Sequence, residues 1–376
     1  MDVNAAVGQG KDVSLKVESA SAIVAERPMY FDYGGRTGGS DVVGATSPST
    51  TWYFAEGYTG AGFVEYITVL NPGEVPANLT FLFQTQEEGE MPPVFGTVQA
   101  SSRATFRVND LLGAGYQTSL KLESSQPVVA ERPMYFDYLG AAGDKHWSGG
   151  HCVMGASSLG KSYLFAEGNT LANFDEYLTL QNPSSSTITV NAIYQMGAGQ
   201  GDPITKGYDI EAGRRLTIYV PGETGGGKDV SVALTSTSDF LAERPMYFNY
   251  QGFGAADWTG GHCVIGASAT APEWFFAEGA TIDNFQEYLC LQNPGSSDAS
   301  VEITYYVQGS GAQDPKSTTV PANSRITIPV NANAGPGLQL SARIKVTSGP
   351  GIIAERPMYF NFGGWTGGHD VVGFTP

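Results

Sequence analysis

Residues 130–136 read Ala-Glu-Arg-Pro-Met-Tyr-Phe. The same seven residues return at positions 25–31, 242–248 and 354–360. A second block, Phe-Ala-Glu-Gly, occurs three times, with its glutamates spaced 111 residues apart at Glu56, Glu167 and Glu278. Similarity at a fixed interval is the signature of a tandem-repeat architecture. The chain is therefore expected to consist of repeats about 111 residues long.

The order of the blocks sets the limits of each repeat. A repeat begins near Phe-Ala-Glu-Gly and ends in a glycine pair, which occurs as Gly38-Gly39, Gly149-Gly150, Gly260-Gly261 and Gly367-Gly368. Complete repeats then cover 50–160, 161–271 and 272–376, and residues 1–49 are the C-terminal half of another repeat. A half repeat at the N-terminus predicts that the native chain continues upstream.

The segments between the blocks have the pattern of strands. Residues 65–72 alternate polar and apolar side chains and end in Asn-Pro, as do residues 176–183 and 287–294. Alternation with period two predicts a half-buried strand, and proline ends strand pairing. A further strand signature, Ala-x-x-Arg-x-Thr-x-x-Val, recurs at 100–108, 212–220 and 322–330.

About seven such strands in each repeat, with turn residues every 8 to 12 positions, indicate an all-β chain of tandem immunoglobulin-like β-sandwich domains. The alternative is a seven-bladed β-propeller made of half-repeats of about 54 residues. This ranks second because the two halves share little beyond one Ala-Glu pair.

Charge limits the partners that the chain can take. The sequence has 37 acidic and 20 basic residues, a formal charge of −17. Such a chain repels phosphate backbones and anionic headgroups, which argues against nucleic acid and membrane surfaces. No apolar run is long enough to cross a bilayer, and residues 1–20 lack the features of a signal peptide. The chain is therefore either cytosolic or a processed fragment, and the repeat phase favours the second.

The combined motifs resemble a family of repeats found in large secreted or wall-associated proteins of actinobacteria and related bacteria. These motifs are Phe-Ala-Glu-Gly, Glu-Tyr-Leu-Thr-Leu-Gln-Asn-Pro, Ala-x-Ser-Arg-x-Thr and Ala-Glu-Arg-Pro-Met-Tyr-Phe with Gly-Gly-His. The Asn-Pro-Gly turn followed by Ala-x-Ser-Arg is also similar to immunoglobulin-like modules of bacterial adhesins. Both resemblances imply an extracellular or cell-surface location, and neither carries known catalytic residues.

The repeated charged residues allow a catalytic and a structural interpretation. Two carboxyl groups could act as general acid and base in glycoside hydrolysis. Repetition in every unit favours instead structural Arg–Glu pairs that join the first and last strands of a unit. The predicted members are Glu56, Arg132, Glu167, Arg244, Glu278 and Arg356. Because adjacent strand residues face opposite ways, one residue of each Glu-Arg pair should point inward.

The histidines after the glycine pairs, His151, His262 and His369, could bind a metal or lie between domains. Their neighbours vary between Cys and Asp, which disfavours a zinc site and favours an inter-domain role. No cofactor is expected, although the acidic loops at 173–176 and 283–287 could offer oxygens to calcium. Three cysteines cannot all pair, and a Cys263–Cys290 bridge is left open, because the sequence does not show whether the two Cα atoms lie close enough.

These patterns predict a non-enzymatic structural or adhesive scaffold, with sandwiches arranged in series as a stalk, layer or filament. Incomplete strands in residues 1–49 could recruit another copy of the chain, giving a homo-oligomer. The alternative is a glycan-binding module that uses loop tryptophans. The candidate residues are Trp147, Trp258 and Trp365. A glycoside-active enzyme is the third possibility.

Overall fold

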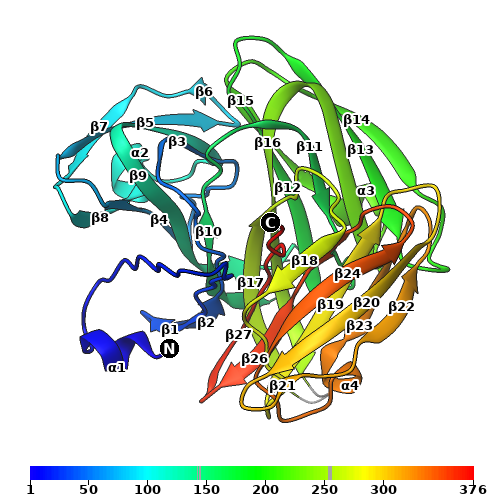
Figure 1. Cartoon of the computed structure of the whole chain (residues 1–376). Coiled ribbons are helices and arrows are strands. Elements are labelled where there is room, and N and C mark those ends of the chain that lie inside the picture. The colour runs from blue at the N-terminus through cyan, green and yellow to red at the C-terminus, as the bar shows by residue number, and fades with distance from the viewer. Residues whose placement is uncertain (142, 144, 253–255) are drawn as a thin grey trace.

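The computed structural model describes residues 1–141, 143, 145–252 and 256–376. Antiparallel strands make up most of this part of the chain, which confirms the all-β prediction. Figure 1 shows three β-structured bodies, with the N-terminal segment at the fourth side. We call the bodies unit 1, unit 2 and unit 3, from the N-terminus to the C-terminus.

The elements follow one order in each unit. The N-terminal segment contains α1 (Val3–Val7), β1 (Met29–Tyr33) and β2 (Arg36–Ser40). Unit 1 contains β3 (Ser49–Phe54), β4 (Phe63–Asn71), β5 (Ala77–Thr85), β6 (Gly89–Glu90), β7 (Val94–Val98), β8 (Ser102–Arg107), α2 (Val108–Leu112), β9 (Thr118–Leu139) and β10 (His146–Met154). Unit 2 contains β11 (Gly160–Phe165), β12 (Phe174–Asn182), β13 (Ile188–Met196), β14 (Ile204–Ile210), β15 (Arg214–Tyr219), α3 (Val220–Thr224), β16 (Val230–Gly252) and β17 (Ala256–Ile265). Unit 3 contains β18 (Glu273–Phe276), β19 (Phe285–Asn293), β20 (Ala299–Val307), β21 (Gly311–Ala312), β22 (Lys316–Val320), β23 (Ser324–Pro329), α4 (Val330–Asn333), β24 (Leu340–Ser348), β25 (Ile353–Glu355), β26 (Met358–Phe362) and β27 (Trp365–His369).

One long strand belongs to both sheets of the sandwich. In unit 1 the first part of β9 pairs with β3 and β5, and its second part pairs with β4 and β10. Apolar side chains from both sheets, among them Trp52, Phe81 and Ile67, form one buried core. Strands β3, β4 and β5 of the first half pair with β9 of the second half, and both halves contribute to one core, so the two halves form one sandwich. The propeller of half-repeats was therefore the wrong alternative.

Short helices recur at one place in each unit, where the sequence predicted no helix. In unit 1, α2 follows β8, and its Asn109 side chain donates to the carbonyl oxygen of Phe63 at 3.1 Å and accepts from the amide of Glu65 at 3.0 Å. Five residues are too few to display a helical period. These bonds hold the start of β4, where the strand carries Glu65.

The strongest departure from expectation is the arrangement of the units. The predicted arrangement was a linear series, with neighbours packed through the Gly-Gly-His segments. Those segments do pack against one another: β10 contacts β2 and β17, while β27 contacts β17 and β2. The strands therefore close a ring, which lies near the centre of Figure 1, and the units surround it. We call the four hairpins β1–β2, β9–β10, β16–β17 and β26–β27 the hairpin ring.

None of the described helices combines the length and the apolar character that crossing a membrane as a helix requires.

Candidate functional site

The repeated Ala-Glu-Arg-Pro residues meet in a cycle of ion pairs around the hairpin ring. Each arginine pairs with the glutamate of the next hairpin. The N–O distances are 2.9 Å for Arg27–Glu131, 2.8 Å for Arg132–Glu243, 2.7 Å for Arg244–Glu355 and 3.3 Å for Arg356–Glu26. The last pair joins unit 3 to the N-terminal segment. The cycle thus closes through residues 330 positions apart in the sequence.

The predicted ion pairs, between the arginine of Ala-Glu-Arg-Pro and the glutamate of Phe-Ala-Glu-Gly in the same unit, form only in part. Arg244 binds the Glu167 carboxylate of its own unit at 2.7 Å. In unit 1, Arg132 instead donates to the main-chain carbonyl of Glu56 at 2.6 Å, and Arg356 makes the equivalent bond to the carbonyl of Glu278. The main side-chain partner comes from the next hairpin, because the Ala-Glu-Arg-Pro strand lies between two units.

This position also explains why both members of a Glu-Arg pair are buried, whereas the sequence led us to expect only one. Glu243 and Arg244 each have 0% of their side chain exposed. Arg244 lies between Glu167 of its own unit and Glu355 of unit 3. Glu243 faces unit 1, where it accepts from the amide of Ala55 at 2.7 Å. Neighbouring side chains do point to opposite faces of the strand, but a protein unit covers each face.

The structure adds arginines that sequence reasoning had not assigned to the site. Arg215 of unit 2 reaches into unit 1, where it donates to the carbonyl of Gly57 at 2.7 Å and pairs with the Glu56 carboxylate at 3.1 Å. Arg325 of unit 3 donates to the carbonyl of Gly168 at 2.8 Å in the same way. Both belong to the Ala-x-x-Arg-x-Thr signature, so its recurrence was the signal that could have identified them.

Glycines and aromatic rings complete the contact between hairpins. An added Cβ at Gly149 would lie 2.9 Å from the Cα of Gly260, and one at Gly260 would lie 3.1 Å from the Cα of Gly367. The tyrosine of each Pro-Met-Tyr-Phe meets the phenylalanine of the preceding hairpin edge to face. The centroid distances are 5.0 Å for Tyr135–Phe31, 4.9 Å for Tyr247–Phe136, 5.0 Å for Tyr359–Phe248 and 4.9 Å for Tyr30–Phe360. The glycine pair thus permits the close approach that these contacts need.

His151, His262 and His369 lie in the ring and are buried. Each packs against the phenylalanine of its own hairpin, with centroids about 6 Å apart. Burial lowers the pKa of His369 to about 4 and lowers the pKa of His151 and His262 well below the usual value. The three imidazoles are therefore neutral at physiological pH.

Among the described residues, Glu167, His262 and Asp370 form a buried group of possible metal ligands within 4.8 Å of one another. Arg244 Nη2 lies 2.7 Å from both carboxylates of this group. A guanidinium between two carboxylates supplies the positive charge that a cation would otherwise bring. The group is therefore explained by the ion-pair cycle.

The acidic residues of the loop at 173–176, one of the two loops considered for calcium, have protein partners. Asp175 accepts from the hydroxyls of Tyr138 and Tyr219 and from the amide of Ala141, at 2.7 to 3.0 Å. Glu176 accepts from the amide of Asn169 at 2.9 Å. These bonds direct the side chains of Asp175 and Glu176 at the protein, whereas Asp283 of the second loop is exposed.

Two of the three candidate glycan-binding tryptophans are not available at the surface. Trp147 and Trp258 have 5% and 2% of their surface exposed, and they pack beside Tyr138 and Tyr250. Trp365 is 37% exposed at the end of its hairpin. The cysteines are buried and unpaired, Cys263 and Cys290 included.

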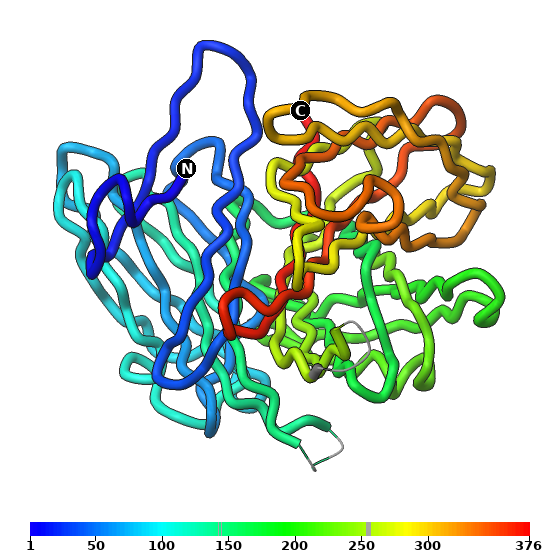
Figure 2. The backbone as a smooth tube through the Cα atoms, turned by 90° about the horizontal axis from the view of Figure 1, so that it is seen from below, coloured from blue at the N-terminus to red at the C-terminus, as the bar shows by residue number. Residues whose placement is uncertain are grey.

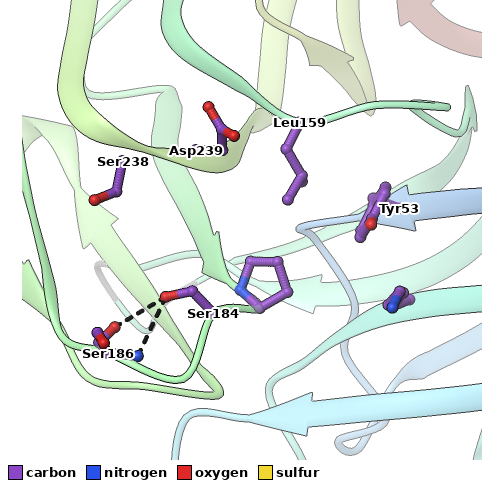
Figure 3. Close-up of a pocket in the computed structure, with 8 residues that line it drawn as sticks. Tyr53, Leu159, Ser184, Ser186, Ser238 and Asp239 are labelled. Atoms are coloured by element: carbon purple, nitrogen blue, oxygen red, sulfur yellow. Dashed lines mark hydrogen bonds between the residues drawn. The ribbon is translucent and has the colours of Figure 1, made fainter.

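Two hollows lie between neighbouring parts of the molecule. One is an open groove of about 400 Å³ between unit 1 and unit 2, where Tyr53 and Leu159 face the serine-rich turn of Ser184 and Ser186 (Figure 3). Asp239 is the acidic residue among its lining residues. The other, of about 460 Å³, is lined by Tyr30 of the N-terminal segment and by Glu278 and Gly279 of unit 3.

A buried carboxyl recurs at the start of the second strand of every unit, as Glu65, Glu176 and Glu287. Burial raises the pKa of each to about 8. A carboxyl group that stays protonated in the folded protein stabilises it below about pH 4.5, and this contribution is lost as the pH rises through about 8.

We predict that Glu176→Gln removes the contribution of this residue to the pH dependence of stability, because glutamine is neutral at every pH. Its advantage in unfolding free energy over the wild type should widen by about 1 kcal/mol per pH unit between pH 5 and pH 8. Urea denaturation at four pH values measures it, with the exposed Glu74→Gln as control. Parallel curves for Glu176→Gln and wild type would contradict the raised pKa.

Comparison with known proteins places the chain in no family. No family model and no curated protein matches it. Among solved structures, it is similar to protein 1070 of Thermotoga maritima, with a TM-score of 0.26 and 12% identity over 30% of this chain and 97% of the other. It is also similar to the Anabaena sensory rhodopsin transducer, with a TM-score of 0.21 and 27% identity over 24% of this chain and 98% of the other. Scores this low carry no argument about function.

Proposed function

We propose that this protein is a non-enzymatic, extracellular scaffold of the cell surface. One observation carries the proposal: the charged residues repeated in every unit are buried in a cycle of ion pairs that joins the units. A residue used to bind one repeat to the next has a structural reason to recur. The same residues held between units are a poor arrangement for an enzyme, since substrate would have to displace the neighbouring unit.

The closed ring supports a compact structural element rather than the linear stalk that the sequence suggested. The chain has a formal net charge of −17, and mutual repulsion between such chains favours a protein that stays dispersed outside the cell. The resemblance to secreted and wall-associated repeats points to the same location.

Surface labelling and gene removal test the proposal. Antibodies against the folded chain should label the exterior of intact producing cells, and removal of the gene should alter attachment or the ordered layer seen by electron cryotomography. Label confined to the cytoplasm, with an unchanged envelope, would contradict the proposal.

A screen against glycosides and a glycan array separates the rival functions. We expect no turnover and no bound glycan. Turnover that is lost in Glu278→Gln would favour an enzyme, since Glu278 borders a hollow. Glycan binding that is lost in Trp365→Ala, the exposed candidate tryptophan, would favour the binding module.

A further inference from the structure

The N-terminal segment repeats the second half of a unit, and its apolar side chains are exposed. Residues 8–31 are similar in sequence to residues 113–136, and α1 occupies the position in the repeat that α2 occupies in unit 1. Leu15, Val17 and Ile23 are 50%, 53% and 54% exposed. Their counterparts in unit 1 are at most 2% exposed, namely Leu120, Leu122 and Val128. In Figure 2 the N-terminal segment, in dark blue, runs along the outside of the molecule.

The counterparts are buried because the first half of their own unit covers them. β3 pairs with β9 through Trp52–Leu122 and Phe54–Leu120, and β5 pairs with β9 on its other side. Residues 11–25 form no strand. Alternating apolar residues in an extended segment are the pattern of a strand that lacks its neighbours.

In the part of the chain that the structure describes, the arginine at the end of this segment, Arg27, lacks a hydrogen-bond acceptor that its counterparts have. In the three full units, the arginine of Ala-Glu-Arg-Pro donates to the carbonyl of the glutamate in Phe-Ala-Glu-Gly. The side chain of Arg27 is 38% exposed, and among the described residues its guanidinium contacts Glu131 and Cys152 alone.

Within the described ranges, Glu131, the ion-pair partner of Arg27, lacks a hydrogen-bond donor that its counterparts have. Glu243, Glu355 and Glu26 accept from the amide of the alanine in Phe-Ala-Glu-Gly, at Ala55, Ala166 and Ala277. Glu131 is contacted by Arg27 and Cys152, and 18% of its side chain is exposed. One extended Phe-Ala-Glu-Gly segment would supply both the acceptor for Arg27 and the donor for Glu131.

The hollow at unit 3 lies where an arginine from the neighbouring unit is bound in units 1 and 2. Arg215 fills this position at unit 1 and Arg325 fills it at unit 2. At unit 3 the equivalent place, beside Glu278 and Gly279, is the hollow of about 460 Å³. Burial raises the pKa of Glu278, and a guanidinium placed there would favour its charged form. The hollow has the surroundings that bind arginine in the other two units.

We infer that the fourth side of the ring is a docking site for one first-half repeat segment, with the pattern of residues 50–107. Its Phe-Ala-Glu-Gly strand pairs with residues 13–17 and contacts Arg27 and Glu131. The arginine of its Ala-x-x-Arg-x-Thr signature enters the hollow beside Glu278. The C-terminal end of the docked segment lies beside Asp2, because Asp2 stands where Arg107 stands in unit 1.

A second copy of this chain does not supply such a segment without unfolding. Each first half in the chain is already covered by its own second half, as the three continuous cores of the units show. The proposal is independent of the scaffold role, because it concerns only what covers residues 13–27.

The test joins a copy of residues 45–106 directly to Asp2 of the full chain. Hydrogen exchange of amides 13–18 should slow by at least about 100-fold relative to the unmodified chain, since these amides enter a sheet. Replacing the copied Arg103 with alanine should reduce protection around Glu278 and Gly279 while leaving the sandwich formed.

A double substitution provides the matched control. Leu15→Asp with Val17→Asp should leave the unmodified chain folded, because both side chains are exposed, but should abolish the protection in the extended chain. Equal exchange of amides 13–18 with and without the copy would overturn the proposal. Protection that the unmodified chain gains only as a dimer in sedimentation equilibrium would overturn it too, in favour of a second copy as the occupant.

Discussion

Arg244→Met is expected to reduce the free energy of unfolding by about 3–5 kcal/mol, the usual effect of leaving buried charges without their partner. Arg244 lies 2.7 Å from carboxylate oxygens of Glu167, Glu355 and Asp370 and has none of its side chain exposed. Methionine fills a similar volume but leaves three carboxyl groups in a medium of low polarity. Urea denaturation at pH 8 measures the loss.

The matched control is Arg107→Met. Arg107 pairs with Asp110 at 3.2 Å, but the two side chains are 45% and 66% exposed. Water screens such a pair, so we expect a change below about 1 kcal/mol. The effect of Arg244→Met should also be smaller at pH 5 than at pH 8, because protons can neutralise the carboxylates left behind. A loss below 1 kcal/mol at pH 8, or one independent of pH, would show that the cycle of ion pairs contributes little.

Gly260→Ala is expected to have the next largest effect, about 3 kcal/mol, at the upper end for an added methyl group in a packed interior. The new Cβ would lie 2.8 Å from the ring of Phe248 and 3.1 Å from the Cα of Gly367. The second contact is with main chain, which cannot rotate away, so two hairpins must separate. Thermal unfolding gives the stability change, and hydrogen exchange in β17 and β27 should show the loosening.

Gly207→Ala is the corresponding control on strand β14. There the nearest atom to an added Cβ, Asn191 Oδ1, is 3.6 Å away, which is an ordinary contact. We expect a change within about 0.5 kcal/mol, as for surface positions in general. If both glycine variants unfold alike, the close approach of the hairpins does not determine stability.

The resemblance of the repeats and the positions of most strands were visible in the sequence, whereas the assignment of the strands to two sheets was not. The period-two runs such as 65–72 predicted strands because each needs one buried face, and this depends only on local order. The long strand β9 includes residues 119–122 and 128–136, whose pattern in the sequence predicts two separate strands.

The candidate site residues were identified, but their partners were not. Repetition singled out Glu56, Arg132 and the other members of the ion-pair set as structural. It could not show that Arg132 pairs with Glu243 rather than with the Glu56 carboxylate, because that choice depends on which unit lies alongside. Arg215 recurs in the Ala-x-x-Arg-x-Thr signature, which marks it as important, but only the packing of the units shows that it reaches into the preceding unit.

By itself, the sequence determined the β-sandwich class, the length of the repeat and the residues that recur in it, since strand period and repetition are properties of order along the chain. Only the tertiary structure decided that the units surround a ring, that Trp147 and Trp258 are buried, and that residues 1–27 lie on an open side of it. Those outcomes depend on contacts between segments more than one hundred residues apart, whose mutual distance is set when the hairpins pack.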